Sequence, residues 1–151
     1  MCGGCLEKNG GQAAQALGRS RGGLSTQIHL IVEALGLPLD FVLTGGQTPE
    51  VTHAPTLLRG PRSEYVLADK SYEAATLFEL MEAQAAIPVM PARSNRKQPH
   101  GPDRDLYKER HAVECFVNQI KQDRHLFSRF DKLASRYLSF LHLVSALIWL
   151  R

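Results

Sequence analysis

The sequence of 151 residues has few cysteines and no long apolar segment. Its three cysteines are an odd number, which argues against a disulfide framework and fits a reducing cytoplasm. Cys2 and Cys5 have the spacing of a zinc or redox pair, but no second pair of ligands follows, so we expect an accidental pair. The N-terminus lacks the apolar core of a signal peptide, and the longest apolar stretch, 137–150, is shorter than the ~20 residues of a membrane span. These absences predict a cytoplasmic protein without a membrane segment.

Charge of neither sign dominates the sequence. The net charge is only +3, while 44% of the residues are hydrophobic and 22% are charged. These fractions are ordinary for a globular protein, and the length is sufficient for one domain with a core. The slight positive charge permits nucleic-acid binding without requiring it.

The order of predicted elements indicates a mixed α/β fold. Residues 1–23 are Gly-rich and basic, and we expect them to be flexible. Two strands, 24–34 and 39–44, predict a β-hairpin. The remaining pattern predicts a helix, a strand, a helix, a strand, a loop and two helices, in the order 48–58, 64–68, 71–85, 87–90, 91–105, 107–121 and 132–150. Strands 64–68 and 87–90 are apolar runs, typical of parallel strands buried on both faces, and Trp149 is predicted to lie in the core.

Two carboxylates lie where an α/β fold commonly places chemistry. Asp69 follows strand 64–68, and ligands gather at the carboxyl ends of such strands. On helix 107–121, at about 100° per residue, an arc about 60° wide contains four polar side chains: Tyr107, Arg110, Glu114 and Lys121. Carboxylates beside cations suit Mg²⁺-dependent phosphoryl transfer. The alternatives are a turn or cap residue at Asp69 and a solvated salt-bridge face around Glu114.

The spacing Tyr107-x2-Arg110-x3-Glu114-x6-Lys121 matches, at every position, the signature of bacterial insertion-sequence DDE transposases. Other blocks resemble the same family. Residues 18–29 are similar to the strand after its first catalytic strand, 41–47 to its next strand and turn, 68–72 to the block with its second catalytic Asp, and 129–150 to its closing helix. The resemblance covers residues 12–151.

The resemblance implies a ribonuclease-H-like fold, a mixed sheet flanked by helices, and an enzyme that cuts DNA at transposon ends and joins them to a target. It implies that Asp69 and Glu114 are the second and third catalytic carboxylates and ligands of two Mg²⁺ (or Mn²⁺) ions. Arg110 and Lys121 would contact DNA phosphates, and Tyr107 would line the site. The family also implies DNA as partner, a homo-oligomer that joins two DNA ends, and a place at the bacterial nucleoid.

The chain departs from the family pattern at three places. Ser71 stands where Gly is usual and Cys115 where Arg is common, but neither change removes a metal ligand. The family's first catalytic Asp precedes the block that begins near Gly18, and there this chain offers only Glu7, without a strand pattern. We therefore expect residues 24–151 to form a partial catalytic domain that lacks the first central strand.

Three functions remain open from the sequence. The first is a truncated or frameshifted transposase fragment that is inactive alone. The second is a non-catalytic DNA-binding remnant or regulator of the intact element, which draws on seven basic residues: Arg93, Arg96, Lys97, Arg124, Arg129, Lys132 and Arg136. The third is a nuclease unrelated to transposition.

Overall fold

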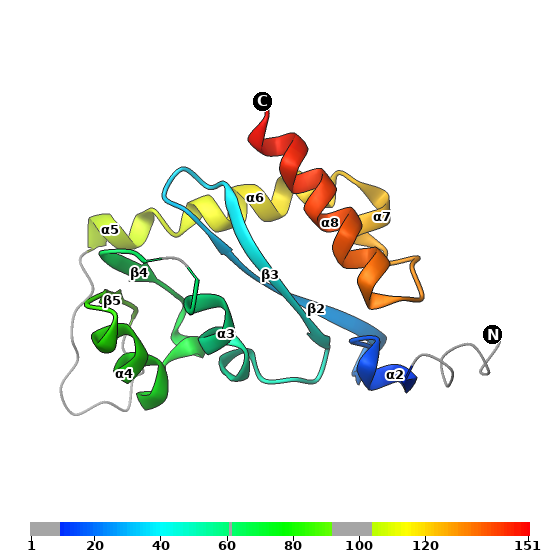
Figure 1. Ribbon diagram of the computed structural model, residues 1–151, viewed down its shortest axis with the longest axis horizontal. Helices are drawn as coiled ribbons and strands as arrows, with labels where there is room; N and C mark the ends of the chain where they lie inside the picture. Colours follow the sequence, from blue (N-terminus) through cyan, green and yellow to red (C-terminus); the bar gives the residue numbers. More distant parts are fainter. Residues whose placement is uncertain (1–9, 61, 92–103) are drawn as a thin grey trace.

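The computed structural model describes residues 10–60, 62–91 and 104–151 (Figure 1). Cys2, Cys5 and nearly all of the predicted loop 91–105 lie outside these ranges. Within the segment 1–23, residues Gly11–Ala14 form helix α2 and Gly18–Ser20 form strand β1. The domain boundary at residue 23 stays a prediction.

The predicted hairpin is confirmed as strands β2 (Gly23–Val32) and β3 (Pro38–Gly45), which pair antiparallel. Strand β1 pairs with the start of β2 only, so the sheet order is β1-β2-β3. The hairpin turn contains Gly36 at φ 85°, in the left-handed region that glycine adopts without a Cβ clash.

A second sheet consists of β4 (Tyr65–Leu67) and β5 (Ile87–Val89), which pair in parallel as predicted. Its strands form no ladder with the three-stranded sheet. The prediction that both strands are fully buried is wrong, because Tyr65 is 38% and Ile87 50% exposed. Apolar residues of β4 and β5 pack mainly toward α4 (Ala75–Ala83), which leaves the other side chains of these short strands near solvent.

The predicted helices are present with shorter bounds or as separate pieces. Region 48–58 is split into η1 (Glu50–Thr52) and α3 (Ala54–Leu58), and the start of 71–85 is the single turn η2 (Lys70–Tyr72). Residues 104–151 contain four helices: α5 (Arg104–Lys108), α6 (His111–Lys121), α7 (Arg124–Phe127) and α8 (Ala134–Trp149). The chain is therefore a mixed α/β structure, as predicted. Among the described residues, no helix has both the length and the apolar character to cross a membrane.

Two hydrophobic clusters make up the core. The first core cluster joins β3 to α6, α7 and α8, and consists of Phe41, Phe116, Ile120, Leu126, Tyr137 and Leu141. The second core cluster joins α3, α4 and the residues on either side of β5, and consists of Ala54, Leu58, Leu77, Met81, Ala86 and Met90. Figure 1 shows the corresponding division, with α3, α4, β4 and β5 on one side of the long hairpin and α7 and α8 on the other.

Strand β2 contributes to both clusters because its side chains alternate in direction. Ile28 and Leu30 pack against the first core cluster, while Ile31 packs against the second. The prediction of a buried Trp149 is wrong: its side chain is 49% exposed. Its Nε1 donates a hydrogen bond to the Pro38 carbonyl at 2.8 Å, so the indole covers the end of the hairpin from the surface.

Candidate active site

The predicted helix 107–121 is interrupted at Arg110, so the prediction of one continuous helix is wrong. Helix α5 ends at Lys108 and α6 begins at His111. At the junction, the Arg110 N–H donates to the Tyr107 carbonyl (3.2 Å) and the Val113 N–H to the Arg110 carbonyl (3.1 Å). These bonds span three residues, and Arg110 has φ −54° and ψ −22°, the geometry of a 3₁₀ turn.

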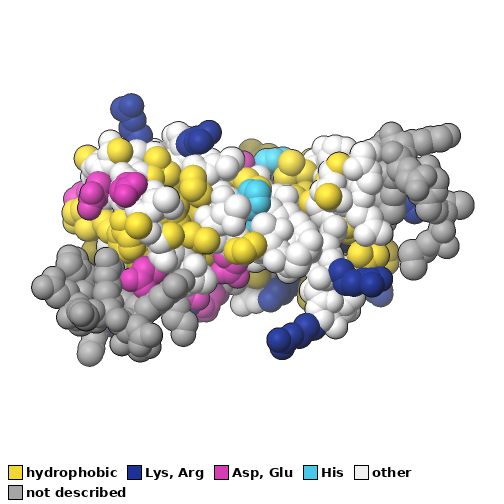
Figure 2. Space-filling view, turned by 90° about the horizontal axis from the view of Figure 1, so that it is seen from below, with side chains coloured by type: hydrophobic (Ala, Val, Ile, Leu, Met, Phe, Trp, Pro, Cys, Tyr) yellow, Lys and Arg dark blue, Asp and Glu magenta, His cyan; other side chains and the backbone are white. Residues whose placement is uncertain are grey.

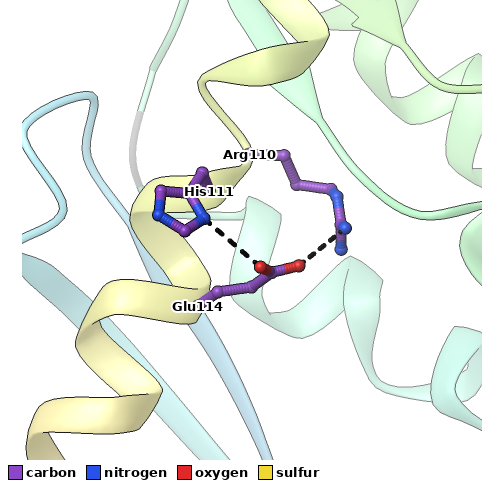
Figure 3. Close-up of polar contacts among 3 residues, drawn as sticks. All are labelled: Arg110, His111 and Glu114. Carbon is purple, nitrogen blue, oxygen red and sulfur yellow. Dashed lines mark hydrogen bonds and ion pairs between the residues drawn. The ribbon is translucent and has the colours of Figure 1, made fainter.

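The tight turn nevertheless keeps Arg110 and Glu114 of the signature in contact, with His111 on the other side of the carboxylate (Figure 3). Arg110 Nη2 lies 2.8 Å from Glu114 Oε1, and His111 Nδ1 lies 3.3 Å from the other carboxylate oxygen. The Arg110 guanidinium also lies over the Tyr107 ring, with Cζ 5.6 Å from the centroid. Glu114 is half exposed, so its carboxylate faces solvent between the Arg110 guanidinium and the His111 imidazole.

Asp69 lies two residues after the end of β4 and is half-buried. It lines a cavity of about 280 Å³, and Arg110 and Val113 line the same cavity from the α6 side. Most of the remaining lining is apolar and comes from β2, α3, β4 and α4: Ile28, Leu30, Ile31, Ala54, Leu57, Leu58, Val66, Leu67, Ala68, Tyr72, Leu77 and Met81, together with Val117 of α6. Arg110 is therefore the side chain that connects the surroundings of Asp69 with Glu114.

Lys121 lies at the other end of α6 and does not join the Arg110–Glu114 group. It is seven residues from Glu114, about 10 Å along the helix axis. Lys121 lines a second cavity of about 280 Å³, which shares Ile28, Leu30 and Val117 with the first. Arg110 and Lys121 thus line two cavities that share residues of β2 and α6.

The described residues alone do not fit a complete metal site. No group of three or more His, Cys, Asp or Glu side chains among them could hold a metal ion. Asp69 and Glu114 provide oxygen donors, the type that Mg²⁺ prefers, but Glu114 already binds Arg110 and His111.

The burial of one polar residue, His29, was not predicted from the sequence. His29 is only 2% exposed, and its Nε2 is 2.8 Å from the Thr44 hydroxyl, while the buried Nδ1 has no hydrogen-bond partner among the described residues. Burial lowers the pKa of His29, and the neighbouring His53, with ring centroids 5.7 Å apart, lowers it further. The signal for a buried histidine was its place between Ile28 and Leu30 in the middle of a strand.

Comparison with known proteins identifies the family. A family model described as a transposase DDE domain matches residues 6–132. The chain belongs to the DDE transposase family. It is also 38% identical over 133 residues to a protein of Brucella ovis named as a candidate transposase for insertion sequence element IS6501, in an alignment that covers 85% of this chain and 100% of that protein. No solved structure matches this transposase chain.

The family match includes the elements that carry the candidate site. Asp69, Arg110, Glu114 and Lys121 all lie within residues 6–132 of this transposase chain. DDE transposases generally use divalent metal ions, whereas the described residues of this chain do not complete a metal site. The family therefore implies chemistry at divalent metal ions, and the described residues alone do not form a complete site for one.

Proposed function

We propose that this chain contributes Asp69 and Glu114 to the active site of a transposase that cuts DNA at the ends of an insertion element and joins them to a target. The observation that carries the proposal is that Arg110, which binds Glu114, lines the same cavity as Asp69. A bound divalent ion would supply charge stabilisation for phosphoryl transfer. The chain's own residues hold the ligands in place: the 3₁₀ turn at Arg110 orients Glu114, and the end of β4 positions Asp69.

The fold that best accommodates these roles is the ribonuclease-H-like arrangement, in which the carboxylates meet at a central strand. Strands β3 and β2 on one side and β4 and β5 on the other supply neighbours for such a strand. We infer that the domain is incomplete in the absence of this strand, and that the chain alone does not cleave DNA. A first carboxylate would come from another reading frame or another chain.

DNA contact is assigned to the cations near the site. In this proposal Arg110 and Lys121 bind phosphates, and the Tyr107 ring, over which the Arg110 guanidinium lies, supports that guanidinium. On the face seen in Figure 2, the Lys and Arg side chains are scattered rather than gathered in one dense patch. We therefore expect moderate, salt-sensitive binding rather than tight non-specific binding. A non-catalytic DNA-binding role for the chain remains the second candidate, favoured by the incomplete metal site.

The test uses the full chain and DNA that carries the ends of the insertion element that encodes it. We expect binding that weakens steeply with salt and persists in EDTA, because phosphate contacts release counterions without requiring a metal. With Mg²⁺ or Mn²⁺, we expect no cleavage by the chain alone. Cleavage should appear when a polypeptide that carries the missing strand and its acid is added, and it should be absent with Glu114→Gln.

Each result decides between the candidates. Nicking by the chain alone that depends on Glu114 would show that the site is already complete. If the chain binds DNA but does not cut it even after the added polypeptide is present, the non-catalytic DNA-binding role is supported. If the chain shows no salt-sensitive association with DNA near physiological ionic strength, neither role holds.

A further inference from the structure

Two exposed aromatic rings lie close together in the chain after α6. Phe127, the last residue of α7, is 68% exposed, and Phe130, three residues later, is 67% exposed. Both residues line one cavity of about 530 Å³, a volume typical of ligand sites. Single exposed apolar side chains are ordinary, whereas two large rings at one cavity form a patch that a ligand can cover.

The segment that carries the rings is held in place from inside the fold. Arg129, between the two phenylalanines, donates from Nη2 to the Gln15 carbonyl at 2.8 Å. Its Cζ also lies 5.2 Å from the centroid of the Tyr137 ring. On the outside, the Phe130 ring makes a T-shaped contact with His125, with 5.7 Å between the ring centroids. These contacts order the platform before a ligand arrives, which lowers the entropic cost of binding.

The cavity of the two rings continues toward the candidate active site. It shares Phe127 with the cavity that Lys121 lines. That second cavity shares Leu30 with the one that Asp69 lines. Together the three cavities include residues of β2 from 24 to 31, which at about 3.3 Å per residue is a length of roughly 23 Å. A linear ligand could therefore reach from Asp69 to the two rings.

The charge around the rings favours an anionic ligand. Residues 121–136 contain five Lys and Arg and two Asp, so their formal charge of +3 equals that of the whole chain. Asp131 lines the cavity of the rings and would oppose an anion, but Lys132 lines the same cavity. Four of the five cations are exposed, namely Lys121, Arg124, Lys132 and Arg136. Aromatic rings among exposed cations are the combination that binds unpaired nucleic acid.

We propose that Phe127 and Phe130 stack on the bases of an unpaired DNA strand, whose phosphates lie along Lys121 and Lys132. The bases of a duplex hide their faces within the stack, so only unpaired nucleotides offer a face to a protein ring. Stacking is sequence-tolerant because every base has such a face. The inference rests on the proposed function for the source of the strand, which is an end of the insertion element opened near Asp69.

The experiment measures fluorescence anisotropy of three labelled 12-mers with the full chain in EDTA. The probes are single-stranded oligo(dT), a single strand with an abasic site at every position, and the duplex of oligo(dT) with oligo(dA). Twelve nucleotides exceed the roughly seven that span the three cavities at ~3.4 Å per stacked nucleotide. We expect oligo(dT) to bind about tenfold more tightly than the abasic strand, which keeps the phosphates but has no bases, and more tightly than the duplex.

Variants of the chain assign the effect to the two rings. Phe127→Leu combined with Phe130→Leu keeps an apolar surface without rings, and should weaken oligo(dT) binding about tenfold while binding of the abasic strand changes less than about twofold. Tyr at both positions should restore oligo(dT) binding. Trp149→Leu makes the same kind of change at an exposed aromatic residue that lines none of the three cavities, and should leave binding of every probe unchanged. Urea unfolding of each variant shows that it is folded.

Equal affinity of the unmodified chain for oligo(dT) and the abasic strand overturns the inference, as does tighter binding of the duplex or no binding of oligo(dT). Equal losses on both single strands in the leucine variant, or no recovery with tyrosine, also overturn it. These results are separate from the cleavage test. A chain that binds duplex ends of the element without this dependence on bases keeps the proposed function and loses the inference. A chain that stacks bases on the two rings but never cleaves, even when complemented, keeps the inference and loses the catalytic role.

Discussion

Arg110 and Glu114 form a contact between two parts of the candidate site: Arg110 Nη2 lies 2.8 Å from Glu114 Oε1, and the same guanidinium side chain lines the cavity that Asp69 lines. Both partners are partly exposed, at 32% and 50%. Such a pair contributes little to stability, so its value lies in orientation of the carboxylate and in a cation placed beside it.

Replacement of Arg110 with Ala should therefore affect DNA more than folding. The free energy of unfolding should fall by less than about 1 kcal/mol, because exposed ion pairs are weak. Affinity for insertion-element ends should fall roughly ten- to hundredfold, as for a lost hydrogen bond to a charged group. Urea unfolding and a binding titration measure the two effects. Lys108→Ala, which removes an exposed pair with Asp105, is the control and should leave affinity nearly unchanged. Equal losses in the two variants would argue against a phosphate contact at Arg110.

Much of the fold could be predicted from local patterns in the sequence. The hairpin around Gly36, the apolar strand before Asp69 and the long C-terminal helix each have a period or a turn signal that tertiary contacts only confirm. The break at Arg110 had no such signal, since no Gly or Pro is present between Tyr107 and Lys121. A helical wheel placed the four polar residues on one side, and the 3₁₀ turn kept Arg110 beside Glu114. Lys121 lies outside this group because the wheel ignores the distance along the axis, and seven residues of α6 separate Lys121 from Glu114.

The candidate site could be predicted only in part, because local sequence pattern identifies residues but not how distant elements lie relative to each other. Residue type and spacing identified Asp69 and Glu114, but the cavity that relates them depends on how two sheets lie relative to each other, which no local pattern encodes. Arg129 illustrates the opposite error. It counted among the basic residues for DNA, but the structure places its guanidinium inside the fold, against main-chain carbonyls. Arg93, Arg96 and Lys97 lie outside the described residues.

Close packing of β1 against β3 predicts a large effect at Gly18. A Cβ added there would collide with the Gln47 side chain and lie 2.8 Å from Gly45 Cα. The main chain of β3 at Gly45 cannot easily move to relieve this contact. Gly18→Ala should lower the free energy of unfolding by roughly 1–3 kcal/mol. At Gly60, an added Cβ meets no atom within 4 Å, so Gly60→Ala should change stability by less than about 0.5 kcal/mol. Urea midpoints compare the two, and indistinguishable values would mean that β1 does not pack as described.

The environment of His29 predicts lower stability in mild acid. Burial first, and then His53, lowers the pKa of His29 in the folded protein, while Glu50 nearby opposes this. Below pH 6.5, the ordinary pKa of a histidine, His29 therefore binds a proton more readily in the unfolded chain than in the folded protein. The stabilisation is complete above pH 6.5 and is lost as pH falls from there toward the folded-state pKa, with a slope of at most about 1.4 kcal/mol per pH unit. His29→Gln should flatten the decline between pH 7 and 5 in denaturant titrations. His125→Gln, at an exposed position, should not, and an equal slope in both variants would contradict the assignment.

Arg129 joins the N-terminal part of the described chain to the helical half. Its Nη2 donates to the Gln15 carbonyl at 2.8 Å and its Nε to the Asp131 carbonyl at 3.0 Å. Its Nη1 donates to the Thr26 hydroxyl, and its Cζ lies 5.2 Å from the centroid of the Tyr137 ring. One planar group thus satisfies acceptors from three segments, which an ammonium on a flexible stem does not reproduce.

Loss of this group should loosen residues 10–20 before the rest of the fold. Arg129→Ala removes the guanidinium donors from partly buried acceptors, so the free energy of unfolding should fall by roughly 2–3 kcal/mol. Hydrogen exchange should accelerate in α2 and β1 at denaturant concentrations where the first core cluster remains protected. Arg129→Lys should recover only part of the loss. Arg124→Ala, at an exposed position of α7, is the matched control and should change neither measurement. If Arg129→Ala unfolds like Arg124→Ala, the N-terminal segment is held by its pairing with β2 and not by the guanidinium.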